Sequence, residues 1–299
     1  SSRTILYLHG GGFVHPLNAR GQLPFAHRCA ESLSSSGVVV TLAVLEYHLA
    51  PARRHPTQLA QSLAALRHLV VDRGVPAGEV VLMGDSAGGN LLLGVLAALR
   101  VAAAGGSGGP VRDVGAAGWW GEGRRLAAAV AVCPWCRLGP YDVGGRGSYE
   151  RNARWDFLGG KELGEFEEAM GLEGVRGVVW GDAVGAAMVA EEEDEDEGTS
   201  EGEMVGGWGG EFWSGVVRGE GRVVERMLVS VGTREVFYDD VVELARLMDT
   251  GVEGGGDDGK VVFVKGPREV HVGPVVDVAL GVKDEEGSLP AILEFFKGL

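Results

Sequence analysis

Short apolar runs alternate with longer segments of helical spacing along most of the chain. Each run is largely continuous, which is typical of a strand buried on both faces of a parallel sheet. The expected strands are residues 4–8, 38–45, 79–83, 126–132, 226–231 and 260–264. The expected helices are residues 22–35, 57–72, 87–104, 239–249 and 288–297. This alternation predicts an α/β fold with a mostly parallel central sheet and helices on both faces.

The interval at about residues 137–220 breaks this rhythm and is rich in glycine, tryptophan and acidic residues. A structureless loop of that length is unusual inside a compact domain. We therefore expect one domain over residues 1–299, with a cap-like insertion at 137–220 that contains helices. Within it, residues 191–203 include the run EEEDEDE, whose like charges repel each other, so we expect a flexible acidic segment there.

The net charge and the apolar runs of the chain argue against some classes of binding partner. The formal net charge of -15 argues against nucleic acid. No apolar run is long enough for an integral membrane segment, and the first residues lack the pattern of a secretory leader. We expect a soluble, cytoplasmic protein. The chain starts almost directly with a strand, however, so this expectation does not take account of any segment upstream of it.

The cysteines leave two interpretations open. Three cysteines do not make a disulfide framework, and only Cys133 and Cys136, in the string CPWC, are closely spaced. A redox pair and a turn after a buried strand both fit this string, and we favour the turn because no thioredoxin-like pattern surrounds it. Zinc is disfavoured since no second ligand pair accompanies them. We expect neither a metal nor an organic cofactor.

The string GDSAG at residues 84–88 directly follows an apolar strand and precedes a helical run. This context predicts a strand-to-helix turn that exposes Ser86 as a nucleophile, with glycines at both ends permitting the strained geometry. The helix N-terminus behind Ser86 supplies backbone N–H groups for a developing oxyanion.

The string HGGGF at residues 9–13 also follows a strand. Successive glycines let backbone N–H groups face a cavity without side chains in the way. Together with the N–H group of Ala87, those of Gly11 and Gly12 are predicted to form an oxyanion hole.

With YHLAP at residues 47–51 and GDSAGGN at residues 84–90, the HGGGF string resembles the hormone-sensitive-lipase-like family of α/β-hydrolases. The resemblance extends from residue 4 to the last expected helix but is poor between about 137 and 220. It implies that His9, Gly10 and Tyr47 support the oxyanion loop. The loop GTREVF also looks like those of fungal acetyl-ester hydrolases.

This fold orders its catalytic residues as Ser, then Asp or Glu, then His. Among the seven histidines, only His271 lies beyond the last expected strand, so we expect it to be the base. In GTREVFYDD, the family pattern makes Glu235 the orienting acid and Asp239 a second, supporting acid near a helix start, with Asp239 as the alternative catalytic acid. Asp85 is expected to brace nearby loops rather than to react.

These residues predict a serine hydrolase that cleaves a small-molecule ester of a small or medium acyl group through an acyl-enzyme. Two alternatives remain: an amidase or formamidase of the same fold, and a non-catalytic small-molecule receptor, because plant gibberellin receptors resemble this family but lack the catalytic histidine. Several tryptophans either line an aromatic substrate site or pack in the cap, namely Trp119, Trp120, Trp155, Trp180, Trp208 and Trp213.

Relatives usually carry a further segment before HGGGF, and this chain has almost none of it. If that segment is absent, we expect an open acyl pocket and a bare sheet edge. Because exposed edges pair with other chains, the sequence leaves open a homodimer or weak stability.

Overall fold

Six strands form one parallel sheet in this computed structural model, which describes residues 2–106, 118–141, 147–187, 209–248 and 259–299. They are β1 (Ser2–Leu8), β2 (Val39–Leu45), β3 (Val80–Asp85), β4 (Leu126–Val132), β5 (Val224–Gly232) and β6 (Val261–Gly266). The order across the sheet is β2-β1-β3-β4-β5-β6, and each neighbouring pair is parallel. The predicted α/β fold is confirmed, and each strand lies close to its expected position.

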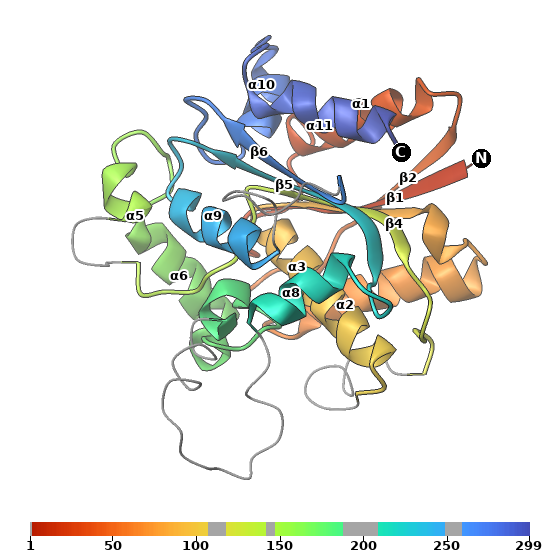
Figure 1. Cartoon of the computed structure of the whole chain (residues 1–299). Coiled ribbons are helices and arrows are strands. Elements are labelled where there is room, and N and C mark those ends of the chain that lie inside the picture. Colours follow the sequence, from red (N-terminus) through yellow and green to blue (C-terminus); the bar gives the residue numbers. More distant parts are fainter. Residues whose placement is uncertain (1, 107–117, 142–146, 188–208, 249–258) are drawn as a thin grey trace.

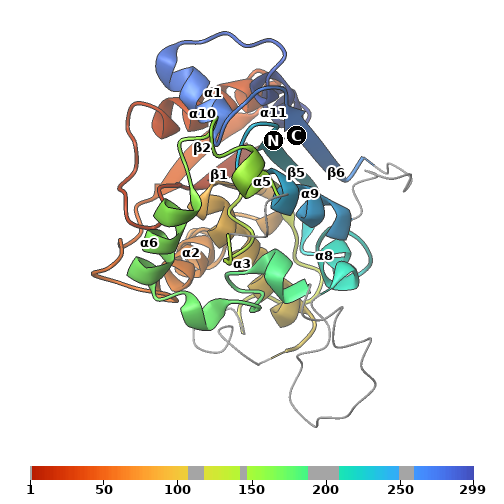
Figure 2. The same cartoon turned by 90° about the vertical axis from the view of Figure 1, so that its left-hand side faces the viewer.

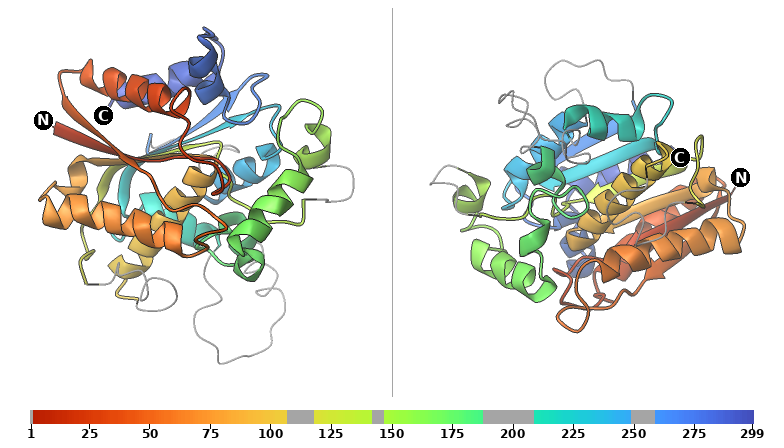
Figure 3. Two further views of the ribbon diagram at one scale, coloured as in Figure 1. Left: turned by 180° about the vertical axis from the view of Figure 1, so that it is seen from behind. Right: turned by 90° about the horizontal axis from the view of Figure 1, so that it is seen from below.

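Helices cover both faces of the sheet (Figure 1). One face carries α1 (Gln22–Ser34), α10 (Gly273–Leu280) and α11 (Ser288–Lys297), and the other carries α2 (Thr57–Arg67), α3 (Ala87–Ala103), α8 (Gly210–Val217) and α9 (Tyr238–Leu247). Figure 3 shows α2 and α3 side by side across this second face. The helix expected at 57–72 is divided, since η1 (His68–Asp72), a π-helical turn, continues α2. A short helix, η2 (Ala77–Glu79), precedes β3.

The strands bury side chains in two layers, as their continuous apolar sequences require. In β1, Ile5 and Tyr7 pack in the layer with α1 and α11, whereas Leu6 and Leu8 pack in the layer with α2 and α3. The edge strand β2 differs, because its residues are exposed or half-buried and Val39 is 72% exposed. Such an edge presents unpaired backbone groups, so the expected self-association stays a prediction.

The residues between β4 and β5 contain helices, as the sequence predicted without giving their bounds. They are α5 (Ser148–Arg151), α6 (Gly160–Met170), η3 (Glu173–Val175) and α8. In Figure 2, α5 and α6 lie in front, at the end of the sheet that faces the viewer. The role of this insertion as a cap stays a prediction, and the acidic run at 191–203 lies outside the described residues. None of the described helices is both long and apolar enough to cross a membrane.

Buried carboxylates hold the insertion together internally and attach it to α9. Asp182 is 2% exposed and accepts three backbone N–H groups, from Leu138, Gly177 and Gly185. Asp240, in the first turn of α9, accepts a hydrogen bond from the Tyr149 hydroxyl at 2.5 Å and lies 3.4 Å from the Arg137 guanidinium. Hydrogen bonds of this kind offset the cost of burying a charged group.

Burial raises the pKa of Asp240 from 3.8 to about 6, although Tyr149 and Arg137 act in the opposite direction. A carboxyl whose pKa is raised by folding contributes most to stability below its ordinary pKa of 3.8, and the contribution is lost as the pH rises through about 6. Asp240→Asn removes this titration. Relative to wild type, the variant should therefore gain on the order of 2–3 kcal/mol in its free energy of unfolding between about pH 4 and about pH 7.

Urea denaturation of both proteins across that pH range measures this difference. Groups that titrate equally in the two proteins cancel in the comparison. Unfolding free energies that stay parallel at every pH would show that Asp240 does not titrate in this range.

Candidate active site

Ser86 lies in a strand-to-helix turn, between the end of β3 at Asp85 and the start of α3 at Ala87. Its backbone has a φ of 53° and a ψ of -118°, a combination that residues other than glycine rarely adopt. Gly88 permits the close packing behind the turn, because a Cβ there would lie 2.0 Å from the carbonyl oxygen of Leu8. The expected strand-to-helix turn is therefore present at Ser86, and Ser86 lines a pocket.

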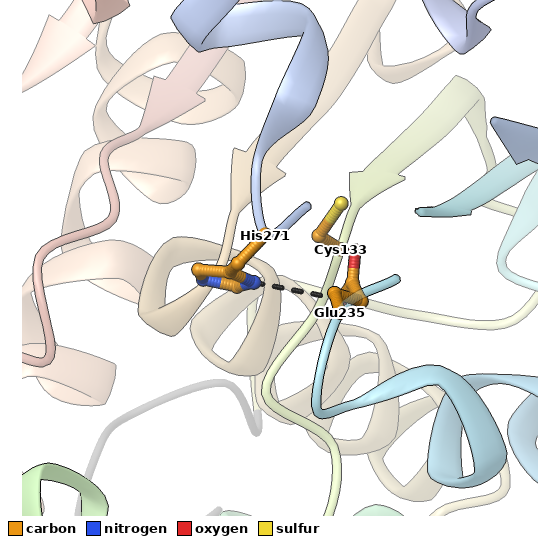
Figure 4. Close-up of side chains that lie close together, drawn as sticks. All are labelled: Cys133, Glu235 and His271. Atoms are coloured by element: carbon orange, nitrogen blue, oxygen red, sulfur yellow. Dashed lines mark hydrogen bonds and ion pairs between the residues drawn. The ribbon is translucent and has the colours of Figure 1, made fainter. Parts of the chain in front are cut away.

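The His271 imidazole lies between Ser86 and Glu235. Its Nε2 is 2.8 Å from Ser86 Oγ, and its Nδ1 is 3.5 Å from Glu235 Oε1. All three residues are buried. Figure 4 shows Glu235 and His271 facing each other, from the loops that follow β5 and β6. The sheet thus brings together a serine and a histidine that are 185 positions apart in the sequence.

The surroundings of His271 favour its protonated form. Burial lowers the pKa of the imidazole, but the hydrogen bond and negative charge of Glu235, with Asp156 and Asp85 adding to them, raise that pKa above the ordinary value of 6.5. A base that accepts a proton during a reaction needs this stabilisation of the imidazolium.

Of the two candidate acids, the structure brings Glu235 to His271. The second carboxylate oxygen of Glu235 accepts the N–H group of Gly232 at 2.8 Å, which fixes the side chain. Asp239 lies instead in the first turn of α9, where its side chain is 45% exposed. It accepts the backbone N–H of Ser148 and pairs with Arg151, each at 2.7 Å.

The glycine loop after β1 is supported by His9 and Tyr47, two of the three residues for which the resemblance implies this role. The Tyr47 hydroxyl donates to the His9 carbonyl oxygen at 2.7 Å, and the two rings stack with centroids 4.2 Å apart. His9 Nδ1 lies 2.7 Å from the Gly10 carbonyl oxygen. Burial lowers the pKa of His9, so its imidazole is held neutral and serves as a packing and hydrogen-bonding group.

Asp85 joins this loop to the nucleophile turn. One of its carboxylate oxygens accepts the Gly10 N–H at 2.9 Å together with the Tyr7 hydroxyl, and the other accepts the Gln22 side-chain amide at 2.9 Å. The sequence indicated such bracing for Asp85 but not its partners. Gln22 begins α1, and no local pattern distinguishes it from any other polar residue at a helix start.

Gly11 and Gly12 have φ angles of 115° and 59°, which L side chains rarely adopt, and both line the pocket with Ser86. Among the described residues, the N–H groups of Gly11, Gly12 and Ala87 have no hydrogen-bond acceptor. Ala87 is the first residue of α3, where helix N–H groups lack partners and carry partial positive charge. These donors are available to an oxygen atom next to Ser86.

A family model described as alpha/beta hydrolase fold matches residues 5–170, which is more than half of the chain. The chain belongs to the alpha/beta hydrolase fold family.

An acetyl-hydrolase of Streptomyces hygroscopicus is 34% identical to this chain over 136 residues, which are 46% of this chain and 37% of the relative. Human arylacetamide deacetylase-like 2 is 31% identical over 98 residues, 31% of this chain and 23% of the relative. The chain thus matches less than two fifths of the length of these curated relatives. A carboxyl esterase 2 from the mycorrhizal fungus Tuber melanosporum shares the fold, with a TM-score of 0.66 at 15% identity over 99% of this chain and 78% of that one.

The pocket beside Ser86 has a volume of about 520 Å³. Its lining is mainly apolar and comes from the segment between β1 and α1, from the nucleophile candidate's turn, from the residues after β4 and β5, from the insertion and from the region of α10. The apolar side chains in the lining include Trp135, Leu158, Leu163, Phe166, Phe237, Val272, Val275, Val276, Ala279 and Leu280. Phe166 packs directly over the glycine loop, because a Cβ on Gly12 would lie 2.4 Å from its ring. The pocket is therefore narrow next to the proposed oxyanion donors.

Two features of this pocket were not predicted from the sequence. The helix α10, which supplies several lining residues, was not expected. Trp135 lines the pocket, whereas Trp119, Trp120, Trp155, Trp180 and Trp213 do not, and Trp208 lies outside the described residues. Trp120, Trp180 and Trp213 are buried in the core instead, which decides in favour of the packing interpretation for them.

Cys133 is a buried thiol next to the catalytic candidates (Figure 4). Ligand atoms of Cys133, Glu235 and His271 all lie within 4.8 Å of one another. Burial, with the charge and hydrogen bond of Glu235, raises the pKa of the Cys133 thiol, and burial together with Asp240 raises that of Cys136. Both cysteines are free. Because the thiolate is the reactive form, these shifts favour the interpretation of CPWC as a turn after β4.

The cysteines should resist alkylation in the folded protein. Incubation with iodoacetamide at about pH 8 should leave Cys29, Cys133 and Cys136 unmodified, because all three are buried and have raised pKa values. After denaturation, mass spectrometry should find all three modified. Rapid modification of Cys133 under native conditions would revive the redox interpretation.

Proposed function

We propose that this chain hydrolyses carboxylic esters of small or medium acyl groups, with Ser86 as nucleophile, His271 as general base and Glu235 as the acid that orients His271. The observation that carries the proposal is the contact of Ser86 Oγ with His271 Nε2 at 2.8 Å, inside an apolar pocket beside unpaired backbone donors. A serine hydroxyl becomes a nucleophile when an adjacent base removes its proton, and this arrangement supplies that base.

In the first step, Ser86 Oγ attacks the ester carbonyl carbon while its proton passes to His271 Nε2. The N–H groups of Gly11, Gly12 and Ala87 bind the oxyanion of the tetrahedral intermediate. Collapse of the intermediate expels the alcohol, which takes the proton from Nε2, and leaves an ester on Ser86. Water then attacks this ester with His271 again as base, and the acid is released. The chain itself supplies the nucleophile, the base and the oxyanion donors, so this reaction needs no metal or cofactor.

The pocket supports short acyl groups. Phe166 occupies the space above Gly12, and Leu163 and Trp135 continue the apolar lining next to it. With its carbonyl oxygen at the glycine loop, an acyl chain on Ser86 would lie beside these bulky side chains, so we expect a short chain to be accommodated better than a long one. Burial of each methylene is favourable only while space remains for it.

Amide hydrolysis by the same residues is the second candidate. It is favoured by the similarity to a protein named arylacetamide deacetylase-like 2. The first step is identical, but the leaving amine must be protonated, so comparison of rates on a matched acetate ester and acetamide separates the two activities. The receptor alternative is disfavoured because His271 is in place against Ser86.

Ser86→Ala should abolish hydrolysis of p-nitrophenyl acetate, butyrate and octanoate, with a loss of at least about 1,000-fold in kcat, because no other group can form the acyl-enzyme. In wild type, acetate and butyrate should be cleaved faster than octanoate. Release of p-nitrophenol, followed by absorbance for both proteins under the same conditions, measures this.

Ser36→Ala is the matched control, because Ser36 is exposed and its hydroxyl donates to the carbonyl oxygen of Lys297 at the end of α11, so the rates of this variant should equal those of wild type. Circular dichroism confirms that each variant is folded. Hydrolysis by folded Ser86→Ala at a rate near that of wild type would refute the assignment of the nucleophile.

A further inference from the structure

Three polar side chains of the insertion reach the loop that carries Glu235. Ser148, Asn152 and Asp156 are spaced four residues apart, from α5 onward. The Ser148 hydroxyl donates to the Val236 carbonyl oxygen at 2.6 Å, and the Asn152 amide donates to the Glu235 carbonyl oxygen at 2.8 Å. The backbone on both sides of the proposed acid is therefore held by the insertion.

Asp156 makes contacts that the other two do not. Its Oδ2 accepts the N–H group of Val236 at 2.8 Å, and its Oδ1 accepts the N–H groups of Phe157 at 2.8 Å and of His271 at 3.3 Å. One carboxylate thus binds both the residue after Glu235 and His271 itself. Hydrogen bonds to a charged acceptor are stronger than neutral ones, so this bridge resists movement of either loop.

Other contacts join these two loops, but farther from the reacting groups. The N–H of Thr233 donates to the Gly266 carbonyl oxygen and that of Arg234 donates to the Glu269 carbonyl oxygen, each at 2.9 Å. Both bonds are made by residues that precede Glu235 and His271 in the sequence. At those positions the Asp156 carboxylate accepts backbone N–H groups from both loops.

We propose that Asp156 is a positioning residue, which holds the Glu235 loop and the His271 loop in the relative position that the base requires and adds negative charge next to the imidazolium. This inference rests on the proposed hydrolase function. The spacing it controls is critical, because Nδ1 and Glu235 Oε1 are already 3.5 Å apart, at the long end of hydrogen bonding. Further separation would remove the support that the base receives.

Asp156 is half-buried, whereas the imidazole on which its charge acts is buried. The titratable groups that face His271 are Glu235 after β5, Asp156 in the insertion, Asp85 at the end of β3 and the Cys133 thiol after β4. The rings of Phe237 and Phe157 pack against the imidazole, with centroids at 4.9 and 5.9 Å. Loss of one negative charge here should make the imidazolium less stable and lower the pKa of His271.

The decisive variant is Asp156→Asn, which keeps the size of the side chain but removes its charge and one acceptor. We expect kcat for p-nitrophenyl acetate to fall by about 10- to 100-fold, since small displacements of catalytic groups have effects of this size, with KM little changed because Asp156 does not line the pocket. The midpoint of the rise in kcat/KM with pH should move to lower pH, because that midpoint reports the pKa of the base.

Three further variants separate positioning from general support of the fold. Asn152→Ala loosens the same segment without altering charge, so it should leave the pH midpoint unchanged. Asp156→Glu keeps the charge but displaces it, so it should lower kcat with the midpoint preserved; it also provides the test if Asp156→Asn does not fold. Glu165→Gln, an exposed carboxylate on α6, should behave as wild type.

The rate at which a fluorophosphonate labels Ser86 gives a readout that does not depend on ester turnover. It should fall in Asp156→Asn by a factor similar to that in kcat. Suppose that wild type is labelled at Ser86. The role of Asp156 is then overturned if folded Asp156→Asn matches wild type in labelling rate and pH midpoint, or if it loses activity like Asn152→Ala with no shift of the pH midpoint. In either case the hydrolase function stands. If wild type is not labelled at Ser86, the hydrolase function fails and the inference fails with it.

Discussion

Placing one imidazole between a serine hydroxyl and a buried carboxylate is the constraint on which the rest of this structure depends. Ser86 follows β3, Glu235 follows β5 and His271 follows β6. Because the carboxyl ends of parallel strands meet at one edge of a sheet, these distant segments arrive at the same place. The strands that carry them have apolar layers on both sides, so the loops start from a rigid base.

The polar groups at this edge are buried or half-buried, and each needs partners to offset the loss of contact with water. Asp85 accepts the N–H of Gly10, Glu235 accepts the N–H of Gly232, and Asp156 accepts those of Val236 and His271. In each case a carboxylate binds backbone rather than a basic side chain. Such bonds fix loop geometry as well as satisfying the charge, which explains how residues outside regular secondary structure are held in place for the proposed reaction.

Features with a local signature could be predicted from the sequence, and features made by distant contacts could not. Continuous apolar runs marked the strands, and GDSAG marked the turn at Ser86, because both depend on neighbouring residues. His271 was predicted as the base from its position after the last strand. By contrast, Asp156 meets His271 across 115 positions, and the hydrogen bond of Gln22 to Asp85 spans 63. Neither spacing leaves a periodic pattern, and the segment around Asp156 lacks the family resemblance seen elsewhere.

The proposed mechanism requires that Ser86 is acylated during turnover. Mass spectrometry of the protein mixed briefly with p-nitrophenyl acetate and quenched in acid detects this acyl-enzyme. We expect a single added acetyl group that digestion locates on Ser86, and no such adduct in Ser86→Ala. Turnover of the ester without acetylation of Ser86, or with the acetyl group on another residue, would contradict it.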